Sequence, residues 1–434
     1  MSDTHQRTIV IIGGGIIGCT TAYYLTHHPS YSPQTTKIIL MEASAAGPAK
    51  GASGKAGGLV AKWAYPKELV AISFPEHIRL AEKYNGAERW GWRFVGCGSW
   101  EGRGEVAGEA PGPGSAVGAG GERRSLAKTA GLPDFKKKRF ELGMPDDLDW
   151  VRADLTFAYS PMAPHGFTGQ VHPFAFTTSM LELAADRGAQ YLAARATSVD
   201  IDRVERVVTG VSYFDRESGT TKSIPATHVV LAAGVWSPQL LPGLPIEGTR
   251  AHSITIKPTE SISPYVIFTE VDLPGTGSAP GTQVSPEIYA RPDNEVYCCG
   301  PGDNSPVPDT VDDVQVDLAA CQAIHDQVSS ISTQLRDGKV DKRQACFLPI
   351  VSAGGGPIIG EAKSIAKGLM IATGHTCWVS PLCTIRRSAE DTHSRLPLQG
   401  ICNAPGTARA ITELVYEGRI RCADLRKMDP ARFI

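Results

Sequence analysis

Three glycines near the N-terminus have the spacing that a phosphate-binding turn requires. Gly13, Gly15 and Gly18 form the motif G-x-G-x-x-G between the β-branched run 8–12 and a segment with apolar residues at helical spacing, 16–24. Gly13 permits the tight turn, Gly15 lets the backbone approach a pyrophosphate, and Gly18 allows the helix to pack closely on the strand. The helix N-terminus adds N–H groups and a positive dipole. Strand, turn and helix together predict a dinucleotide site, whereas glycines without that context would merely make a turn.

An acidic residue and a second loop of small residues narrow the choice of dinucleotide. Glu42 follows the buried run 37–41, where its carboxylate suits ribose hydroxyls and disfavours the 2′-phosphate of NADP. The segment 51–58, Gly-Ala-Ser-Gly-Lys-Ala-Gly-Gly, suits backbone contact with a pyrophosphate and a flavin ring, and NAD enzymes have no need of it. A third apolar run, 229–234, ends in small residues where the backbone can approach the dinucleotide again. The sequence therefore predicts FAD as the cofactor.

The cofactor-binding residues predicted from these segments belong to the two glycine loops and to the ends of the three apolar runs. They are Gly13, Gly15, Ile16, Ile17, Gly18, Glu42, Ala43, Ser53, Lys55, Ala56, Gly57, Gly58, Leu59, Ala232, Ala233, Gly234 and Trp236.

The charge balance of the chain gives no reason to expect a polyanionic partner. The 434 residues carry 43 Lys and Arg against 45 Asp and Glu, so no bulk field attracts nucleic acid or an anionic membrane. The polar N-terminus and the glycines that break the first apolar run fit neither a signal peptide nor a membrane span. The ten cysteines show no spacing typical of a zinc site, so no metal is expected. We expect a cytoplasmic enzyme with a small-molecule substrate.

The order of the predicted elements indicates two interleaved domains. A strand, helix and strand open the chain, antiparallel strands fill its middle, and a buried strand at 369–372 with a helix at 407–416 closes it. The predicted fold class is α/β plus α+β, with a discontinuous Rossmann-type FAD-binding domain and a second, mainly antiparallel β-sheet domain for the substrate. The expected bounds are 1–95 plus 150–250 plus 345–434 for the FAD-binding domain, 251–344 with parts of 60–170 for the substrate domain, and 101–125 for a flexible loop rich in Gly, Ala, Glu and Pro.

These segments resemble the D-amino-acid oxidase and glycine oxidase superfamily of FAD-dependent oxidoreductases. The resemblance continues through His-Pro-Phe at 172–174, Tyr-Ala-Arg-Pro-Asp at 289–293 and Gly-His at 374–375. Gly-His-Thr-Cys-Trp at 374–378 and Asn-Ala-Pro-Gly-Thr at 403–407 are most similar to a fungal branch that includes a yeast protein implicated in endosome-to-Golgi traffic. The resemblance implies hydride transfer from an amine or amino acid to flavin N5, with oxygen as the electron acceptor, and it adds Val199, Cys346, Gly374, His375, Gly400, Ile401 and Asn403 to the cofactor-binding residues.

The resemblance also shows where this sequence departs from its relatives. Glycine oxidases place a carboxylate-binding Arg at the position of Leu348, so Arg291, Arg250 or Arg343 would have to substitute for it. The segment 287–300 lacks the Lys that helps oxygen react in sarcosine oxidases. A flavin-binding protein without turnover, associated with endosomes and acting in endosome-to-Golgi traffic, is therefore the alternative to an amine or amino-acid oxidase.

Three residues keep two interpretations each. Cys346 lies near the position where sarcosine-oxidase relatives form a thioether to the flavin, but a lone strand cysteine also suits a buried apolar position. Arg291 could bind substrate or form a salt bridge. His375 could titrate in catalysis or pack against the flavin as a buried neutral imidazole. Arg291 and His375 are the candidate catalytic residues.

An insert interrupts the loop that, by resemblance, wraps the pyrimidine edge of the flavin. Relatives run from the Trp of Gly-His-Thr-Cys-Trp directly into Gly-Ile, whereas here residues 379–399 intervene. The segment corresponds to 63 nucleotides that begin with a Val codon and end with a Gln codon, the boundaries of a short fungal intron. We hypothesise a retained intron, because the polar, aperiodic stretch 386–395 shows no packing pattern.

Overall fold

The computed structural model describes residues 7–105, 135–275, 280–354, 356–376 and 400–434. Its first large sheet has the strand order β10-β9-β8-β2-β1-β11-β19-β18. The five strands from β8 to β19 in that order pair in parallel, while β18, β9 and β10 pair antiparallel to their neighbours. The strands are β1 (Arg7–Ile12), β2 (Thr36–Glu42), β8 (Gln190–Asp202), β9 (Val207–Asp215), β10 (Thr220–Pro225), β11 (His228–Leu231), β18 (Ile358–Glu361) and β19 (Leu369–Thr373).

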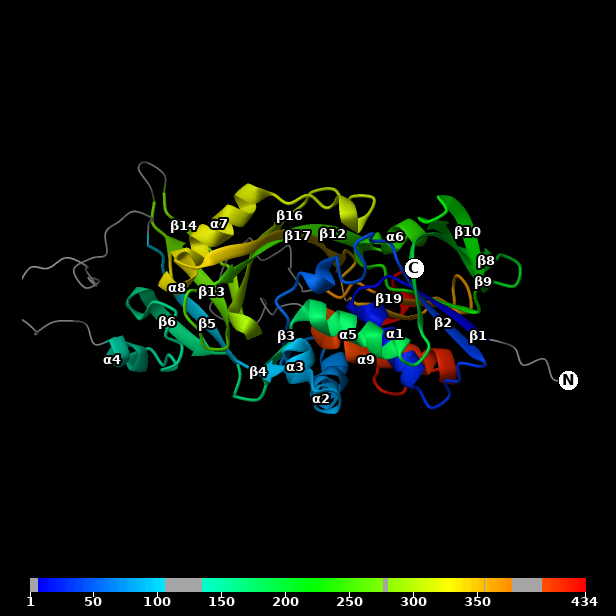
Figure 1. Cartoon of the computed structure of the whole chain (residues 1–434), viewed down its shortest axis with the longest axis horizontal. Helices are drawn as coiled ribbons and strands as arrows, with labels where there is room; N and C mark the ends of the chain where they lie inside the picture. Colours follow the sequence, from blue (N-terminus) through cyan, green and yellow to red (C-terminus); the bar gives the residue numbers. More distant parts are fainter. Residues whose placement is uncertain (1–6, 106–134, 276–279, 355, 377–399) are drawn as a thin grey trace, which may run out of the picture.

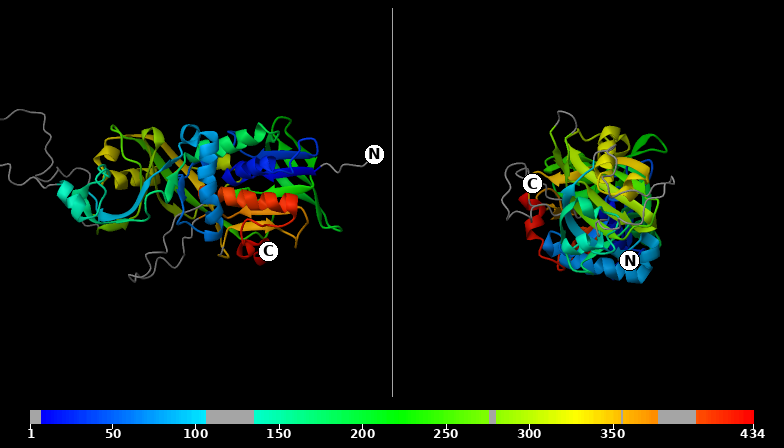
Figure 2. Two further views of the ribbon diagram at one scale, coloured as in Figure 1. Left: turned by 90° about the horizontal axis from the view of Figure 1, so that it is seen from below. Right: turned by 90° about the vertical axis from the view of Figure 1, so that its left-hand side faces the viewer.

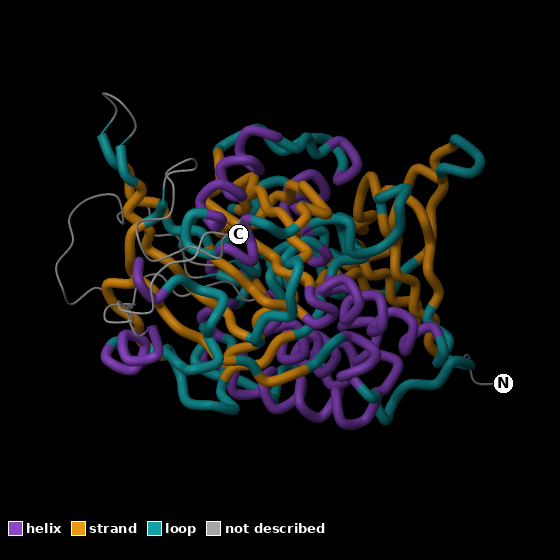
Figure 3. Tube along the Cα trace, turned by 60° about the vertical axis from the view of Figure 1, so that its left-hand side comes forward, coloured by secondary structure: helices purple, strands orange, loops and turns teal. Residues whose placement is uncertain are grey.

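Helices from opposite ends of the chain cover one face of this sheet. α1 (Ile16–His27) packs between α5 (Pro173–Ala185) and α9 (Gly400–Glu417), and α9 also packs on α2 (Lys67–Tyr84) (Figures 1 and 3). The chain therefore leaves this layer and returns to it, as the sequence predicts. In the described part of the chain, no helix combines the length and apolarity that crossing a bilayer requires.

A second large sheet lies beside the first along the long axis of the molecule (Figures 1 and 2). Its order is β17-β12-β16-β15-β13-β5-β6, with β14 paired to β13, and only β13 and β5 pair in parallel. The strands are β5 (Gly96–Arg103), β6 (Thr156–Pro161), β12 (Ile246–Lys257), β13 (Tyr265–Leu273), β14 (Thr282–Val284), β15 (Glu287–Arg291), β16 (Glu295–Asp303) and β17 (Lys339–Val351). The remaining elements are β3 (Leu59–Ala61), β4 (Arg93–Phe94), β7 (Thr168–Gln170), α3 (Gly86–Trp90), α4 (Phe135–Glu141), α6 (Ser237–Leu240), α7 (Leu318–Ser329) and α8 (Thr333–Arg336).

This architecture confirms the predicted fold class, a Rossmann-type sheet combined with a mainly antiparallel one. The exact domain bounds stay a prediction. The predicted loop 101–125 was wrong at its start, because β5 continues to Arg103 through pairing with β13 and β6. Residues 106–134 and the predicted insert 379–399 lie outside the described residues.

The prediction for the last helix was also wrong, because α9 begins at Gly400 and includes the Asn-Ala-Pro-Gly-Thr segment. Pro405 has no N–H to donate to Ile401 O, and the Gly406 N–H donates to Ser73 Oγ at 2.9 Å. His77 Nε2 lies 3.1 Å from Ile401 O and 3.2 Å from Cys402 O, where its N–H donates to both. Ser73 and His77 of α2 thus supply hydrogen bonds to the backbone of the turn that contains Pro405.

Candidate functional site

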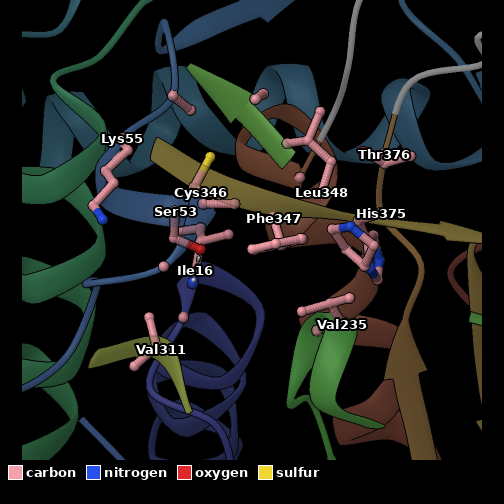
Figure 4. A pocket seen from close by; sticks show the side chains of 18 of the residues that line it. Ile16, Ser53, Lys55, Val235, Val311, Cys346, Phe347, Leu348, His375 and Thr376 are labelled. Atoms are coloured by element: carbon pink, nitrogen blue, oxygen red, sulfur yellow. Dashed lines mark hydrogen bonds between the residues drawn. The ribbon is translucent and has the colours of Figure 1, made fainter. Parts of the chain in front are cut away.

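A cavity of about 960 Å³ extends from the carboxyl ends of β1, β2 and β11 to the second large sheet. Ligands of α/β proteins bind at this edge of a parallel sheet. β17 crosses the cavity with Cys346, Phe347 and Leu348 beside His375, while Ile16 and Ser53 lie at the beginning of α1 (Figure 4). Both sheets therefore contribute to one site of a size typical of cofactor pockets.

The first glycine turn leaves no room for side chains. A Cβ on Gly13, whose φ is +114°, would stand 2.4 Å from Ala232 O, and a Cβ on Gly18 would stand 1.9 Å from Gly13 O. Gly15 faces the cavity, where a Cβ would lie 3.0 Å from Ser53 Oγ. Ser53 Oγ accepts the N–H of Ile16 at 2.8 Å. Backbone thus lines this part of the cavity at a helix N-terminus, as a pyrophosphate requires.

Glu42 is fixed at the end of β2 by backbone amides. Its Oε2 accepts from Gly14 N at 2.6 Å and its Oε1 accepts from Ser44 N at 2.7 Å. Burial raises the pKa of Glu42, and these amide hydrogen bonds oppose that effect. Each carboxylate oxygen retains acceptor capacity, and the residue lines the cavity, so the geometry suits the predicted contact with ribose hydroxyls.

Residues of the second sheet hold the second glycine loop in place. Lys55 Nζ donates to Ala345 O at 2.8 Å, and burial lowers the pKa of Lys55. A Cβ on Gly57 would stand 2.6 Å from the Tyr289 ring. The Arg291 guanidinium donates to Ala56 O and to Gly57 O. Side chains of β15 therefore pack directly against the glycine loop that the sequence predicts to bind the flavin.

Arg291 does not line the cavity. Its side chain is 2 % exposed, pairs with Glu295 Oε1 at 2.7 Å and lies 4.6 Å from the centroid of the Tyr297 ring. The two other arginines considered for a substrate carboxylate are also directed elsewhere: Arg250 pairs with Asp303, and Arg343 is exposed. None of the three lines the cavity. This arrangement favours a buried salt bridge over a substrate role for Arg291.

Cys346 and Leu348 share one face of β17, and both line the cavity. Burial raises the pKa of the Cys346 thiol to about 11, although the nearby Lys55 acts in the opposite direction. The thiol is therefore protonated at neutral pH. Phe347 lies between Leu348 and Val235 in Figure 4, so the wall here is largely apolar.

His375 is buried where the chain leaves β19. Its Nε2 lies 2.9 Å from Thr407 Oγ1 of α9, and burial lowers its pKa to about 3. The imidazole is neutral over the whole physiological range. A Cβ built on Gly400 would stand 3.4 Å from His375 O, so the described residues on either side of segment 377–399 lie close together.

Most of the sequence-predicted site residues are brought together around this cavity. Gly18, Val199, Asn403 and Arg291 do not line it. Gly18 instead permits the close turn, and Asn403 Nδ2 donates to Tyr65 O at 2.9 Å. The predicted residues that do line it are Gly13, Gly15, Ile16, Ile17, Glu42, Ala43, Ser53, Lys55, Ala56, Gly57, Gly58, Leu59, Ala232, Ala233, Gly234, Trp236, Cys346, Gly374, His375, Gly400 and Ile401.

Sequence reasoning missed residues at both ends of the cavity. Ala194 to Ala196 line it in place of Val199, because the parallel pairing of β8 with β2 ends at Ala193 and Val199 lies in the antiparallel extension toward β9. Glu287 and Tyr289 also line it. The sequence held a signal for them: Glu287 and Tyr289 alternate with the predicted site residue Arg291 along β15, and residues two apart in a strand share a face.

Comparisons with known proteins agree with this geometry. A family model described as "FAD dependent oxidoreductase" matches residues 8–414. "Putative oxidoreductase TDA3" of Saccharomyces cerevisiae is 30% identical, covering 98% of this chain and 94% of its own. "Putative oxidoreductase C1F5.03c" of Schizosaccharomyces pombe is 31% identical, covering 98% of both chains.

Solved structures share the fold at lower identity. Glycine oxidase from Bacillus cereus has a TM-score of 0.64 at 18% identity, covering 95% of this chain and 96% of its own. L-proline dehydrogenase from P. horikoshii has a TM-score of 0.65 at 16% identity, covering 99% and 98%. The chain belongs to the D-amino-acid oxidase family of FAD-dependent oxidoreductases, and its cofactor is FAD.

Proposed function

We propose that FAD lies along the cavity with its pyrophosphate at Gly13 to Ile16 and its ribose hydroxyls at Glu42. The observation that carries this placement is the cradle around Gly15, where a Cβ would fill the space beside Ser53 Oγ. The flavin ring would then lie between the second glycine loop and β17, next to Cys346 and His375. Bound FAD supplies the hydride acceptor for oxidation of a substrate.

We further propose that the substrate is an amine or amino acid whose C–N bond is oxidised, with oxygen as the final acceptor. The printed functions of the structural neighbours include oxidation of glycine and dehydrogenation of L-proline. In this chain Tyr289, Phe347 and Leu348 would exclude water from the reacting carbon. His375 is neutral and hydrogen-bonded to Thr407. It would position the cofactor and would not act as a proton donor or acceptor in the reaction.

Oxygen consumption and hydrogen peroxide formation on a panel of amines and amino acids test this function. An oxidase releases peroxide with at least one substrate. Reduction of the flavin without peroxide would replace oxygen with another acceptor. A flavin that no member of the panel reduces would contradict the enzyme function and favour the alternative of a flavin protein without turnover, which the apolar Leu348 makes worth testing.

A further inference from the structure

Glu287 places a carboxylate in the cavity without a counter-charge. Its Oε2 accepts from the Tyr289 hydroxyl at 2.5 Å, and the Cys299 thiol lies 3.7 Å from the same oxygen. Among the described residues no donor reaches Oε1, and no Lys, Arg or His pairs with the group. Burial raises the pKa of Glu287, with only these two side-chain hydrogen bonds opposing it.

The two neighbouring cross-strand pairs of β15 and β16 each join side chains that satisfy one another. β15 and β16 align Arg291 with Glu295, Tyr289 with Tyr297, and Glu287 with Cys299. The first pair is a salt bridge and the second is an aromatic contact, with centroids 5.6 Å apart. The third places a carboxylate beside a thiol whose pKa burial raises, so the thiol brings no positive charge. Buried carboxylates are normally paired, and without a partner burial favours the protonated form of Glu287. A cationic ligand beside it would restore the charged form and supply the missing partner.

None of the cations among the described residues that line the cavity pairs with Glu287. Lys55 donates to Ala345 O, and Lys50 lies 4.9 Å from the centroid of the Phe174 ring. Arg195 lies on β8, next to the end of the parallel pairing near Glu42.

We propose that the substrate is an alkylamine that binds as an ammonium ion and has no α-carboxylate, with Glu287 as its anionic partner. This substrate class rests on the proposed amine oxidation. The ammonium N–H groups donate to Glu287, and the alkyl chain extends along the apolar lining of the cavity. The carboxylate of an α-amino acid, which lies next to its ammonium group, would stand beside the Glu287 carboxylate, so the site discriminates against amino acids by repulsion and by desolvation of an unpaired anion.

Three probes that share an unbranched five-carbon chain test this assignment. n-Pentylamine carries only the cation, hexanoate only the anion, and norleucine carries both. Calorimetric titration of the FAD-loaded protein, with its flavin chemically reduced beforehand and kept anaerobic, measures binding without turnover, because reduced flavin cannot accept a hydride. We expect pentylamine to bind and norleucine and hexanoate to bind at least about tenfold more weakly.

Two variants locate the binding. Glu287→Gln should weaken pentylamine binding roughly 10- to 100-fold, since it removes a charge-assisted hydrogen bond while keeping the shape of the side chain. Glu247→Gln makes the same change at an exposed position of β12 in the same sheet and should leave binding unchanged. Glu287→Asp keeps the negative charge and should retain most of the pentylamine binding, and it provides an independent readout if Glu287→Gln fails to fold.

The outcomes separate this proposal from the proposed function. Equal binding of pentylamine and norleucine, binding of none of the probes, or pentylamine binding that Glu287→Gln leaves unchanged would each overturn the substrate class. Pentylamine binding that is lost equally in Glu287→Asp and Glu287→Gln would overturn the role of the negative charge. If pentylamine binds at Glu287 but no amine reduces the flavin, the binding site stands and the catalytic function fails. If amino acids reduce the flavin of parent and Glu287→Gln alike, the function stands and the substrate class fails.

Discussion

Arg291 and Glu295 form a salt bridge within the second sheet, 2.7 Å between Nη1 and Oε1, and this bridge fixes the guanidinium that contacts the second glycine loop. The side chains are only 2 % and 10 % exposed, and the same guanidinium donates to Ala56 O and Gly57 O. Arg291, a candidate substrate ligand from the sequence, is thus positioned to support the second glycine loop. Its contribution should appear in stability and in FAD retention.

Arg291→Met should lower the free energy of unfolding by up to about 3–5 kcal/mol, because it removes the buried partner of Glu295 and leaves only the half-exposed Lys342, whose Nζ lies 3.3 Å from Glu295 Oε2. The protein should also lose FAD during purification. Urea unfolding and the flavin-to-protein ratio measure the two effects. The double variant Arg291→Met with Glu295→Leu should recover part of the stability, and equal instability of both variants would contradict this explanation.

Gly15→Ala tests the proposed position of the pyrophosphate. The residue has no positive φ, so alanine is compatible with the backbone, but its methyl group would lie 3.0 Å from Ser53 Oγ at the cavity wall. We expect FAD affinity to fall about tenfold or more, with little change in the thermal unfolding of the cofactor-free protein. Fluorescence titration with FAD gives the affinity. Unchanged affinity would place the pyrophosphate elsewhere.

His77 should make stability depend on pH. Burial lowers its pKa from 6.5 to about 4 in the folded protein, so between these values the unfolded chain binds more protons. The contribution of His77 is complete above about pH 6.5 and is lost as the pH falls toward about 4.

The variant His77→Gln isolates this effect, because its amide can donate to Ile401 O and Cys402 O but does not titrate. The free energy of unfolding, measured by urea titration between about pH 4 and 7, should fall with decreasing pH less steeply than in the parent, by up to about 1.4 kcal/mol per pH unit. Parallel curves for the two proteins would show that His77 does not titrate in this way.

The flavin should remain non-covalent despite the position of Cys346. Thioether formation needs a thiolate, and burial raises the pKa of this thiol to about 11. Acid precipitation should leave the yellow colour in the supernatant, and Cys346→Ser should behave in the same way. A yellow pellet from the parent and a colourless one from Cys346→Ser would establish a covalent bond instead.

Removing residues 379–399 should preserve the site. His375 and Gly400 lie close together, so the chain can close without the insert. The deletion variant should retain FAD at least as well as the parent, as measured by the flavin-to-protein ratio. A mature transcript that contains the segment would refute the intron hypothesis, and loss of FAD from the variant would show that the insert contributes to the site.

The local motifs were predictable because each places its own chemistry within a few residues. Gly13 to Gly18, Glu42 and the loop 51–58 indicate a dinucleotide through turn geometry and strand ends alone. The environments of Arg291 and Glu287 were not predictable, since they depend on the register of β15 against β16. The early start of α9 was missed because its proline is compensated by Ser73 and His77, more than 300 residues away in sequence.

Anaerobic mixing of the FAD-loaded protein with alkylamines tests the central claim most directly, because it follows the flavin itself and needs no assumption about the electron acceptor. The account predicts that the yellow colour bleaches with at least one amine at a rate that saturates with amine concentration. A fully loaded, folded protein whose flavin stays oxidised with every amine and amino acid would contradict it.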